Sequence, residues 1–193
     1  MAETDLPKEQ HDRRCRTCVL LHAVMGVATA RVLTPDHPFI DQVLSALHEI
    51  YADDLVAVAL FGSVARRTAR PDSDLDLFVV VSGLPPGRGA RLATFDAIER
   101  RLAPAIAELD AAGIRVELSP VLRTPEDLQT ASPLLLDLTE DAVIRVDRGG
   151  VFGAALEDLR VRLRRLGSQR IWTGPTWYWD LKPDYQRGER FEL

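Results

Sequence analysis

The stretch LFGSVARRTARPDSDLDLFVV, residues 60–80, decides the fold of this chain. One apolar run ends at Gly62-Ser63, an arginine-rich connector follows, and a second apolar run starts after Asp74. Both runs are short and continuous, which is typical of strands in a sheet that is covered on at least one face. Asp74 and Asp76 stand at the mouth of the second strand, although aspartate is a poor strand former and its charge is costly to bury.

Hydrophobic spacing on either side of this stretch predicts a small α+β (α/β) domain with a mixed sheet and flanking helices. We expect helices at residues 36–51, 88–112, 134–138 and 151–166. We expect strands at residues 55–61, 75–81, 114–122 and 143–146. Pro104 predicts a break or kink in the longest helix, and Thr124 with Pro125 has the pattern of a helix start.

The domain organisation that we predict has three parts. Residues 1–35 form an N-terminal helical extension, residues 36–148 the sheet domain, and residues 149–193 a helix with an aromatic tail. All three tryptophans lie in this tail. Because aromatic side chains usually pack where their polar tips find partners, we expect the tail to dock on the domain. Stacking on nucleic acid bases is the alternative.

Composition excludes several classes of protein. Hydrophobic residues make up 46% and charged residues 27% of the 193 residues, as in globular proteins with a core. The net charge of -5 gives no global attraction to nucleic acid or to an anionic membrane. No apolar run approaches the roughly 20 residues of a membrane span, the start lacks a signal-peptide pattern, and two cysteines make no disulfide framework. We therefore expect a cytoplasmic protein with no membrane association.

The two aspartates favour a metal site. Residues alternate between the faces of a strand, so Asp74 and Asp76 project to the same side, about 7 Å apart along the strand. Two neighbouring carboxylates raise each other's pKa unless a cation lies between them. Oxygen ligands of this kind suit Mg²⁺, which takes its remaining ligands from water and substrate phosphates.

The glycine-serine turn favours a phosphate site beside that metal. Backbone N–H groups exposed where a strand ends and a helix begins attract anions, and the lack of a side chain on Gly62 lets phosphate approach the backbone. Arg66, Arg67 and Arg70 add positive charge nearby. A metal-binding carboxylate pair next to a phosphate cradle indicates phosphoryl or nucleotidyl transfer.

These residues carry a family resemblance. The stretch GSVARRTARPDSDLDLFVV resembles the signature of the DNA polymerase beta-like nucleotidyltransferase superfamily, in which G-S is followed by D-x-D, and is most similar to the minimal bacterial nucleotidyltransferases. The resemblance covers about residues 55–122. It implies a compact mixed sheet and transfer of a nucleoside monophosphate from an NTP to an acceptor, with release of pyrophosphate and two Mg²⁺ ions, or Mn²⁺, as cofactors.

The resemblance also implies roles for individual residues. Gly62 and Ser63 would hold the triphosphate, Arg66 would steady it, and Asp74 and Asp76 would be catalytic metal ligands.

A third carboxylate is expected on a neighbouring strand, and Glu117 in IRVELSPV has that placement. The resemblance implies that Glu117 bridges the catalytic metal and helps to deprotonate the acceptor. A solvated strand residue is the alternative interpretation.

The acceptor stays open between tRNA, a protein side chain and an aminoglycoside-like small molecule, and a partner toxin is a further possible partner. An antitoxin-like or nucleotide- or RNA-binding module without turnover is the alternative to an enzyme. Arginines on the last helix leave an RNA-binding face open, although a solvated face is the default. These are Arg160, Arg162, Arg164 and Arg165, with Arg170 just beyond the helix.

A weaker pattern near the N-terminus has the residue types of a zinc site, although helical spacing favours a structural helix face. It consists of His11, Cys15, Cys18 and His22.

Overall fold

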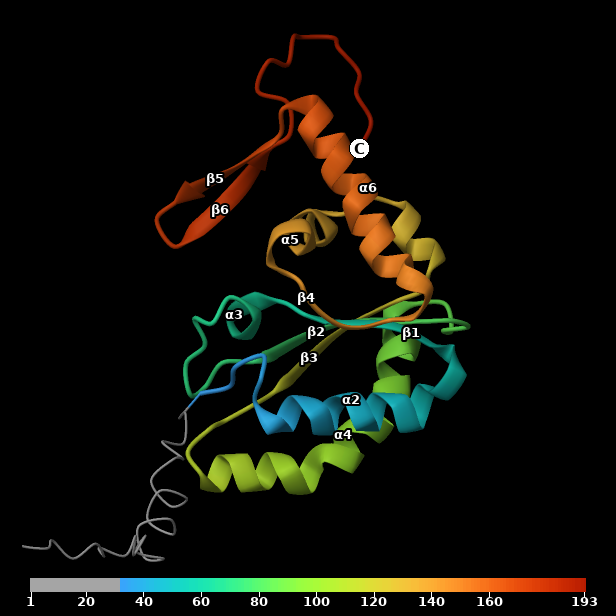
Figure 1. Cartoon of the computed structure of the whole chain (residues 1–193), viewed down its shortest axis with the longest axis vertical. Helices are drawn as coiled ribbons and strands as arrows, with labels where there is room; N and C mark the ends of the chain where they lie inside the picture. The colour runs from blue at the N-terminus through green and yellow to red at the C-terminus, as the bar shows by residue number, and fades with distance from the viewer. Residues whose placement is uncertain (1–31) are drawn as a thin grey trace, which may run out of the picture. The chain divides into compact units, whose positions relative to one another are not determined.

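A four-stranded mixed sheet organises residues 32–193, the part of the chain that the computed structural model describes (Figure 1). The strands lie in the order β3-β2-β1-β4. β1 is antiparallel to both β2 and β4, whereas β2 and β3 are parallel. Their bounds are Leu55–Leu60 for β1, Leu75–Val81 for β2, Leu118–Arg123 for β3 and Val143–Asp147 for β4. The mixed α+β class predicted from the sequence is confirmed.

Helices cover both faces of this sheet (Figure 1). α2 and α4 pack on one face, and α5 and α6 on the other. The helices are α2 (Pro38–Tyr51), α3 (Gly62–Ala65), α4 (Arg88–Ala111), α5 (Pro133–Asp141) and α6 (Val151–Leu166). Short 3-10 segments are η1 (Ala52–Asp54), η2 (Glu126–Gln129) and η3 (Arg148–Gly150). A separate hairpin follows α6 and consists of β5 (Gln169–Thr173) and β6 (Thr176–Asp180).

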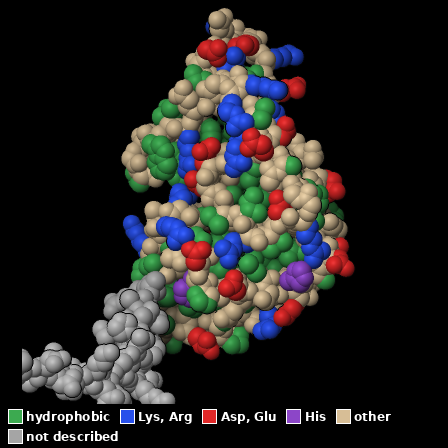
Figure 2. Space-filling view, viewed as in Figure 1, with side chains coloured by type: hydrophobic (Ala, Val, Ile, Leu, Met, Phe, Trp, Pro, Cys, Tyr) green, Lys and Arg blue, Asp and Glu red, His purple; other side chains and the backbone are tan. Residues whose placement is uncertain are grey.

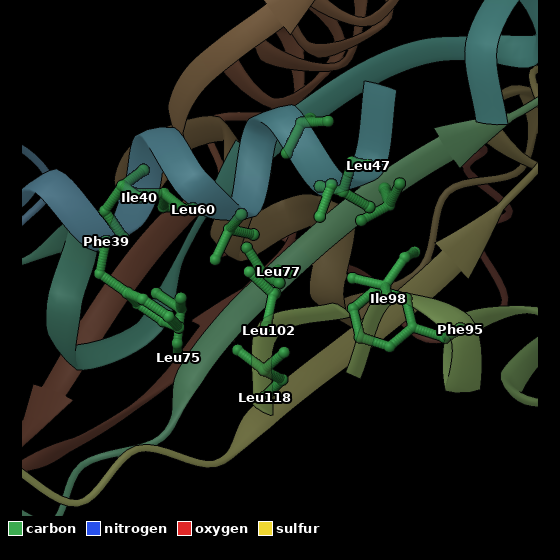
Figure 3. Close-up of a cluster of buried hydrophobic side chains, with 14 of the residues drawn as sticks. Phe39, Ile40, Leu47, Leu60, Leu75, Leu77, Phe95, Ile98, Leu102 and Leu118 are labelled. Carbon is green, nitrogen blue, oxygen red and sulfur yellow. The ribbon is translucent and has the colours of Figure 1, made fainter. Parts of the chain in front are cut away.

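Strand alternation sorts the core into two layers. Leu75 and Leu77 of β2 belong to the layer under α2 and α4, which Figure 3 shows together with side chains of those helices. Phe78 and Val80 belong to the layer under α5 and α6. Each large apolar side chain buried in this way contributes roughly 1.5–3 kcal/mol of transfer free energy. By the same alternation, Asp76 lies on the face of the sheet that α5 and α6 cover.

The predicted strand at residues 114–122 starts later than its alternating pattern indicates. β3 begins at Leu118, because the amide of Ile114 still bonds to the carbonyl of Leu109 at the end of α4 (2.9 Å). Between Ile114 and β3, isolated backbone hydrogen bonds join the chain to the segment before and at the start of β2. The amide of Leu75 donates to the carbonyl of Glu117 (2.8 Å), and the amide of Arg115 donates to the carbonyl of Pro71 (2.7 Å).

The helix start predicted at Thr124 and Pro125 gives only the 3-10 segment η2. The Asp127 carboxylate accepts from the Thr124 amide (2.9 Å) and from Arg91, which fixes a tight turn at this point. Ser132 then caps a new helix, because its hydroxyl accepts from the amide of Leu135 (3.3 Å).

The structure tests the predictions on membrane spans, the N-terminus and the domain boundaries only in part. No helix in the described residues 32–193 is long and apolar enough to span a membrane. The N-terminal helix and the zinc pattern of His11, Cys15, Cys18 and His22 lie outside the described residues. The domain boundaries expected after residues 35 and 148 stay predictions.

Candidate active site

The turn between β1 and α3 requires glycine for two reasons. Gly62 has a φ of +67°, in the left-handed region that side chains disfavour. A Cβ atom built on Gly62 would also lie 1.9 Å from Oδ2 of Asp76. The backbone joins the same two elements, since the amide of Phe61 donates to the carbonyl of Asp76 (3.2 Å). The sequence-predicted glycine turn and the second aspartate are therefore in direct contact.

Asp76 is a half-buried carboxylate whose negative charge is only partly compensated by its neighbours. Burial raises its pKa, and the negative charge of Asp74 raises it further. Hydrogen bonding from Ser119 and the positive charge of Arg66 act in the opposite direction but do not cancel the rise. Asp74 precedes β2 and is exposed. A cation bound between the two aspartates would relieve both the repulsion and the cost of burial.

Glu117 shares the face of the two aspartates but does not form a closed cluster with them. Leu75 pairs with Leu118 and Asp76 with Ser119, so alternation puts Glu117 on the same face, one residue before the first pair. Its side chain is exposed. Within residues 32–193, no group of three or more His, Cys, Asp or Glu side chains lies close enough to hold a metal ion. The structure thus brings Gly62 and Asp76 together, with Asp74 beside them, and leaves Glu117 at the edge.

The oxygen donors nevertheless fit Mg²⁺. Asp76 presents a carboxylate whose charge the protein compensates only in part. Two carboxylates are enough for an ion that takes its remaining ligands from water and substrate phosphates. Asp74 and Asp76 would be its protein ligands.

Arg66 is held beside this turn rather than free in solvent. It directly follows α3, and its Nη1 donates to Oδ2 of Asp141 on α5 (3.1 Å). Its guanidinium carbon also lies 5.0 Å from the ring centroid of Trp177 on β6. Arg67, by contrast, forms an exposed ion pair with Asp36 (2.7 Å). The positive charge predicted at the turn is therefore placed mainly through Arg66.

The partners of Arg66 belong to a cluster that the sequence-based reasoning missed. Arg170 of β5 donates from Nη1 and Nη2 to the two carboxylate oxygens of Asp141 (2.9 and 2.8 Å). Burial alone would raise the pKa of Asp141, but the hydrogen bonds and charges of Arg170, and then of Arg66, hold it below its ordinary value. Asp137 accepts from the indole N–H groups of Trp177 and Trp179 (2.6 and 2.9 Å).

These contacts join side chains of the hairpin to carboxylates of α5, whereas docking of the tail as a whole stays a prediction. The hairpin itself was not predicted, although a signal for it was present. Gly174-Pro175 separates two runs rich in β-formers, which is typical of a hairpin.

Three arginines of α6 are compensated locally, which weakens the case for an RNA-binding face. Arg160 donates twice to the carbonyl of Thr139 (2.8 and 2.6 Å). Arg162 pairs with Asp158 (2.9 Å). Arg164 pairs with Glu157 (2.8 Å). RNA binding by this helix stays a prediction.

Comparison with known proteins places the chain in a family. The model of the family described as "Nucleotidyltransferase domain" matches residues 40–145, more than half of the chain. The chain belongs to the nucleotidyltransferase domain family. This nucleotidyltransferase is 30% identical over 129 residues to a protein of Methanocaldococcus jannaschii named "Putative protein adenylyltransferase", a match that covers 66% of the chain and 82% of the relative. The predicted superfamily and the enzyme class are confirmed.

Solved structures similar to the nucleotidyltransferase include two toxin-antitoxin complexes. One, described as the toxin-antitoxin with AMP-PNP, has a TM-score of 0.41 and 17% identity, and the match covers 65% of this chain and 89% of the other. The second contains the tri-AMPylated HEPN toxin of Shewanella oneidensis in complex with MNT antitoxin. It has a TM-score of 0.36 and 15% identity, with 65% and 86% of the two chains covered.

Proposed function

We propose that this nucleotidyltransferase transfers the adenylyl group of ATP to a side-chain hydroxyl of a protein, with Mg²⁺ held by Asp74, Asp76 and Glu117. The observation that carries the proposal is the contact of Gly62 with the half-buried Asp76, whose pKa is raised by burial and by Asp74. The relative from Methanocaldococcus jannaschii, by its name a protein adenylyltransferase, supports ATP as donor and protein as acceptor.

The reaction that we propose is a single displacement. The acceptor oxygen bonds to the α-phosphorus of ATP, the bond from that phosphorus to the bridging oxygen breaks, and pyrophosphate leaves. The acceptor proton passes to Glu117, which is exposed and on the face of the two aspartates. The Gly62-Ser63 turn and Arg66 bind the triphosphate and orient it. Bound Mg²⁺ would neutralise charge on the phosphates as the leaving group departs.

Other acceptors, or binding without turnover, would have a different outcome at the same site. Transfer to tRNA or to an aminoglycoside-like molecule would use the same residues and would label a different acceptor. An antitoxin-like protein could adenylylate its partner toxin, which is a case of the proposed protein acceptor. A nucleotide- or RNA-binding module would bind without turnover. We expect the reaction in the cytoplasm, where ATP and Mg²⁺ are supplied.

The test is transfer of label from each of the four α-³²P-NTPs, with Mg²⁺, to a cell extract. Parallel samples are treated with protease or ribonuclease, and Asp76→Asn is the matched control because it removes one charge and keeps the side-chain volume. We expect ATP alone to label protease-sensitive, ribonuclease-resistant material, and only with the wild type. Label in RNA or in small molecules would contradict the protein acceptor. No transfer with Mg²⁺ or Mn²⁺ would contradict the enzyme.

A further inference from the structure

We infer that the C-terminal hairpin is part of the nucleotide site, in which Trp177, Arg170 and Asp141 act as positioning residues that hold Arg66 where it binds the triphosphate. The inference rests on the proposed function and extends the site to residues from α5 and the hairpin. The side chains of Asp141 and Arg170 are 13% and 11% exposed, and Arg66 is 29% exposed. The hairpin is therefore built into the wall beside the catalytic turn.

Trp177 is the centre of the contacts that hold Arg66. Its ring lies 5.0 Å from the guanidinium carbon of Arg66 and 4.1 Å from that of Arg170. Arg170 lies 4.9 Å from the ring of Trp172 as well. Cation–π contacts of this kind stabilise by about 0.5–2 kcal/mol, depending on desolvation. An arginine side chain has roughly 2 kcal/mol of rotamer entropy to lose, so a guanidinium already held in place binds phosphate at a smaller entropic cost.

The acidic charges of the cluster gather around Arg170. Arg66 and Arg170 share the single carboxylate of Asp141, and the bidentate contact goes to Arg170. Asp137 accepts from two indole N–H groups, and its negative charge acts on Arg170 together with that of Glu140. The positive charge of Arg66 reaches the active site, because it lowers the pKa of Asp76. A triphosphate bound at Gly62-Ser63 would thus meet a cation that is held in place and that bonds to Asp141 through Nη1 alone.

The hairpin depends on side-chain contacts for its own placement. β5 and β6 pair only with each other and form a separate two-stranded sheet. A lone two-stranded hairpin is marginally stable in water. Its indole and guanidinium contacts to Asp137 and Asp141, together with the packing of Trp179 against the core under α5 and α6, therefore hold it in place. Exposed hydrophobic side chains lie over the hairpin (Figure 2). Trp172 is 55% exposed and lies on the face of Trp177, whereas Tyr178 is 57% exposed and lies on the opposite face.

The experiment measures binding of α,β-methylene-ATP with Mg²⁺ by titration calorimetry, which reports affinity without turnover. Trp177→Ala removes the ring between the two guanidiniums, and Trp177→Leu keeps an apolar side chain without a π-face. Trp177→Phe restores a π-face without the indole N–H. Tyr178→Ala is the control, because it is the next residue on β6 and is exposed. Thermal melts confirm that each variant is folded.

We expect Trp177→Ala and Trp177→Leu to weaken binding on the order of tenfold, and Trp177→Phe to recover most of the loss. Tyr178→Ala should bind like the wild type. In the Arg66→Ala background, Trp177→Ala should have no further effect, because it acts through Arg66. Wild-type affinity in both Trp177→Ala and Trp177→Leu, or additive losses in the double variant, would overturn the inference and leave the proposed function standing. Failure of the wild type to bind α,β-methylene-ATP or any of the four NTPs would overturn both.

Discussion

Gly62→Ala is expected to damage both stability and catalysis, through two separable effects. Alanine at a φ of +67° costs about 1–2 kcal/mol in backbone strain. The new Cβ would lie 1.9 Å from Oδ2 and 2.8 Å from Cγ of Asp76, so that carboxylate must leave its position. Forcing a side chain off its rotamer costs about 0.5–1.5 kcal/mol. The free energy of unfolding should therefore fall by roughly 1.5–3.5 kcal/mol in total.

Gly83→Ala is the matched control for the backbone effect. Gly83 has a φ of +68°, and nothing lies within 4 Å of a Cβ built on it. This variant should lose only the strain of about 1–2 kcal/mol. For a chain of this size, each kcal/mol lowers the Tm by roughly 2–4 °C, so thermal melts resolve the difference between the two variants. Nucleotidyl transfer should fall about a hundredfold in Gly62→Ala, because a misplaced catalytic group has an effect of that order, and should not change in Gly83→Ala.

A double variant isolates the steric contact with Asp76. Asp76→Ala removes Oδ2 and Cγ and leaves only a Cβ, 3.2 Å from the methyl group that Gly62→Ala introduces. In that background, Gly62→Ala should cost about as much stability as Gly83→Ala costs in the wild type. Equal losses in Gly62→Ala and Gly83→Ala, with transfer retained in both, would refute the assigned role of the glycine.

Four further outcomes are expected. Without divalent cations, Asp76→Asn should have a higher Tm than the wild type at neutral pH. Its gain in free energy of unfolding should be no more than about 1 kcal/mol, because the carboxylate is half-exposed. Since the folded-state pKa of Asp76 is raised, the wild type loses stability as pH rises through that pKa. In EDTA, the Tm values of the wild type and of Asp76→Asn should therefore become equal at a pH below the ordinary aspartate pKa. Asp141→Asn should cost about 2–3 kcal/mol and shift tryptophan fluorescence to the red at neutral pH, because Trp172, Trp177 and Trp179 all lie in the hairpin. In the wild type the pKa of Asp141 is lowered, so pairing is intact above the ordinary aspartate range and the same red shift should appear only as pH falls through the lowered value. Glu117→Gln should slow transfer at least about tenfold and change stability by less than about 0.5 kcal/mol, because the side chain is exposed; unchanged kinetics would identify a solvated strand residue. Mg²⁺ with ATP at a hundredfold excess over Kd should stabilise by about 2.7 kcal/mol, which thermal melts with and without EDTA measure.

The sheet and its helices were predictable because their signals are local. β1 and β2 are continuous apolar runs, and α2 and α6 repeat apolar residues at helical spacing over several turns. The glycine turn and the two aspartates could be predicted for the same reason. They lie about ten residues apart in the sequence, and one turn and one strand fix their positions relative to each other. β3 was misplaced at its start because the end of α4, and not the alternation at residues 114–117, decides where pairing begins.

The cluster around Arg66 could not be found in this way. Asp141 comes from α5, and Arg170 and Trp177 come from the hairpin, so no periodicity in the sequence connects them. The arginine pattern of α6, by contrast, left open a binding surface that the structure does not support. Its arginines look like one charged face in the sequence, yet three of them form contacts with carboxylates or carbonyls beside them. Charge in a sequence predicts a binding surface only where the fold leaves that charge without partners.

The cost of an aspartate pair at the mouth of a buried strand now has a physical explanation. Arg66 is the cation that reaches Asp76, but it is also held by Asp141 and by the ring of Trp177, so its charge is divided between two carboxylates. Full pairing with Asp76 would lower the pKa of that carboxyl and remove the need for a metal ion. A shared arginine leaves the pair undercompensated. In the function that we propose, a bound metal–nucleotide complex would supply the missing compensation and would thereby stabilise the fold.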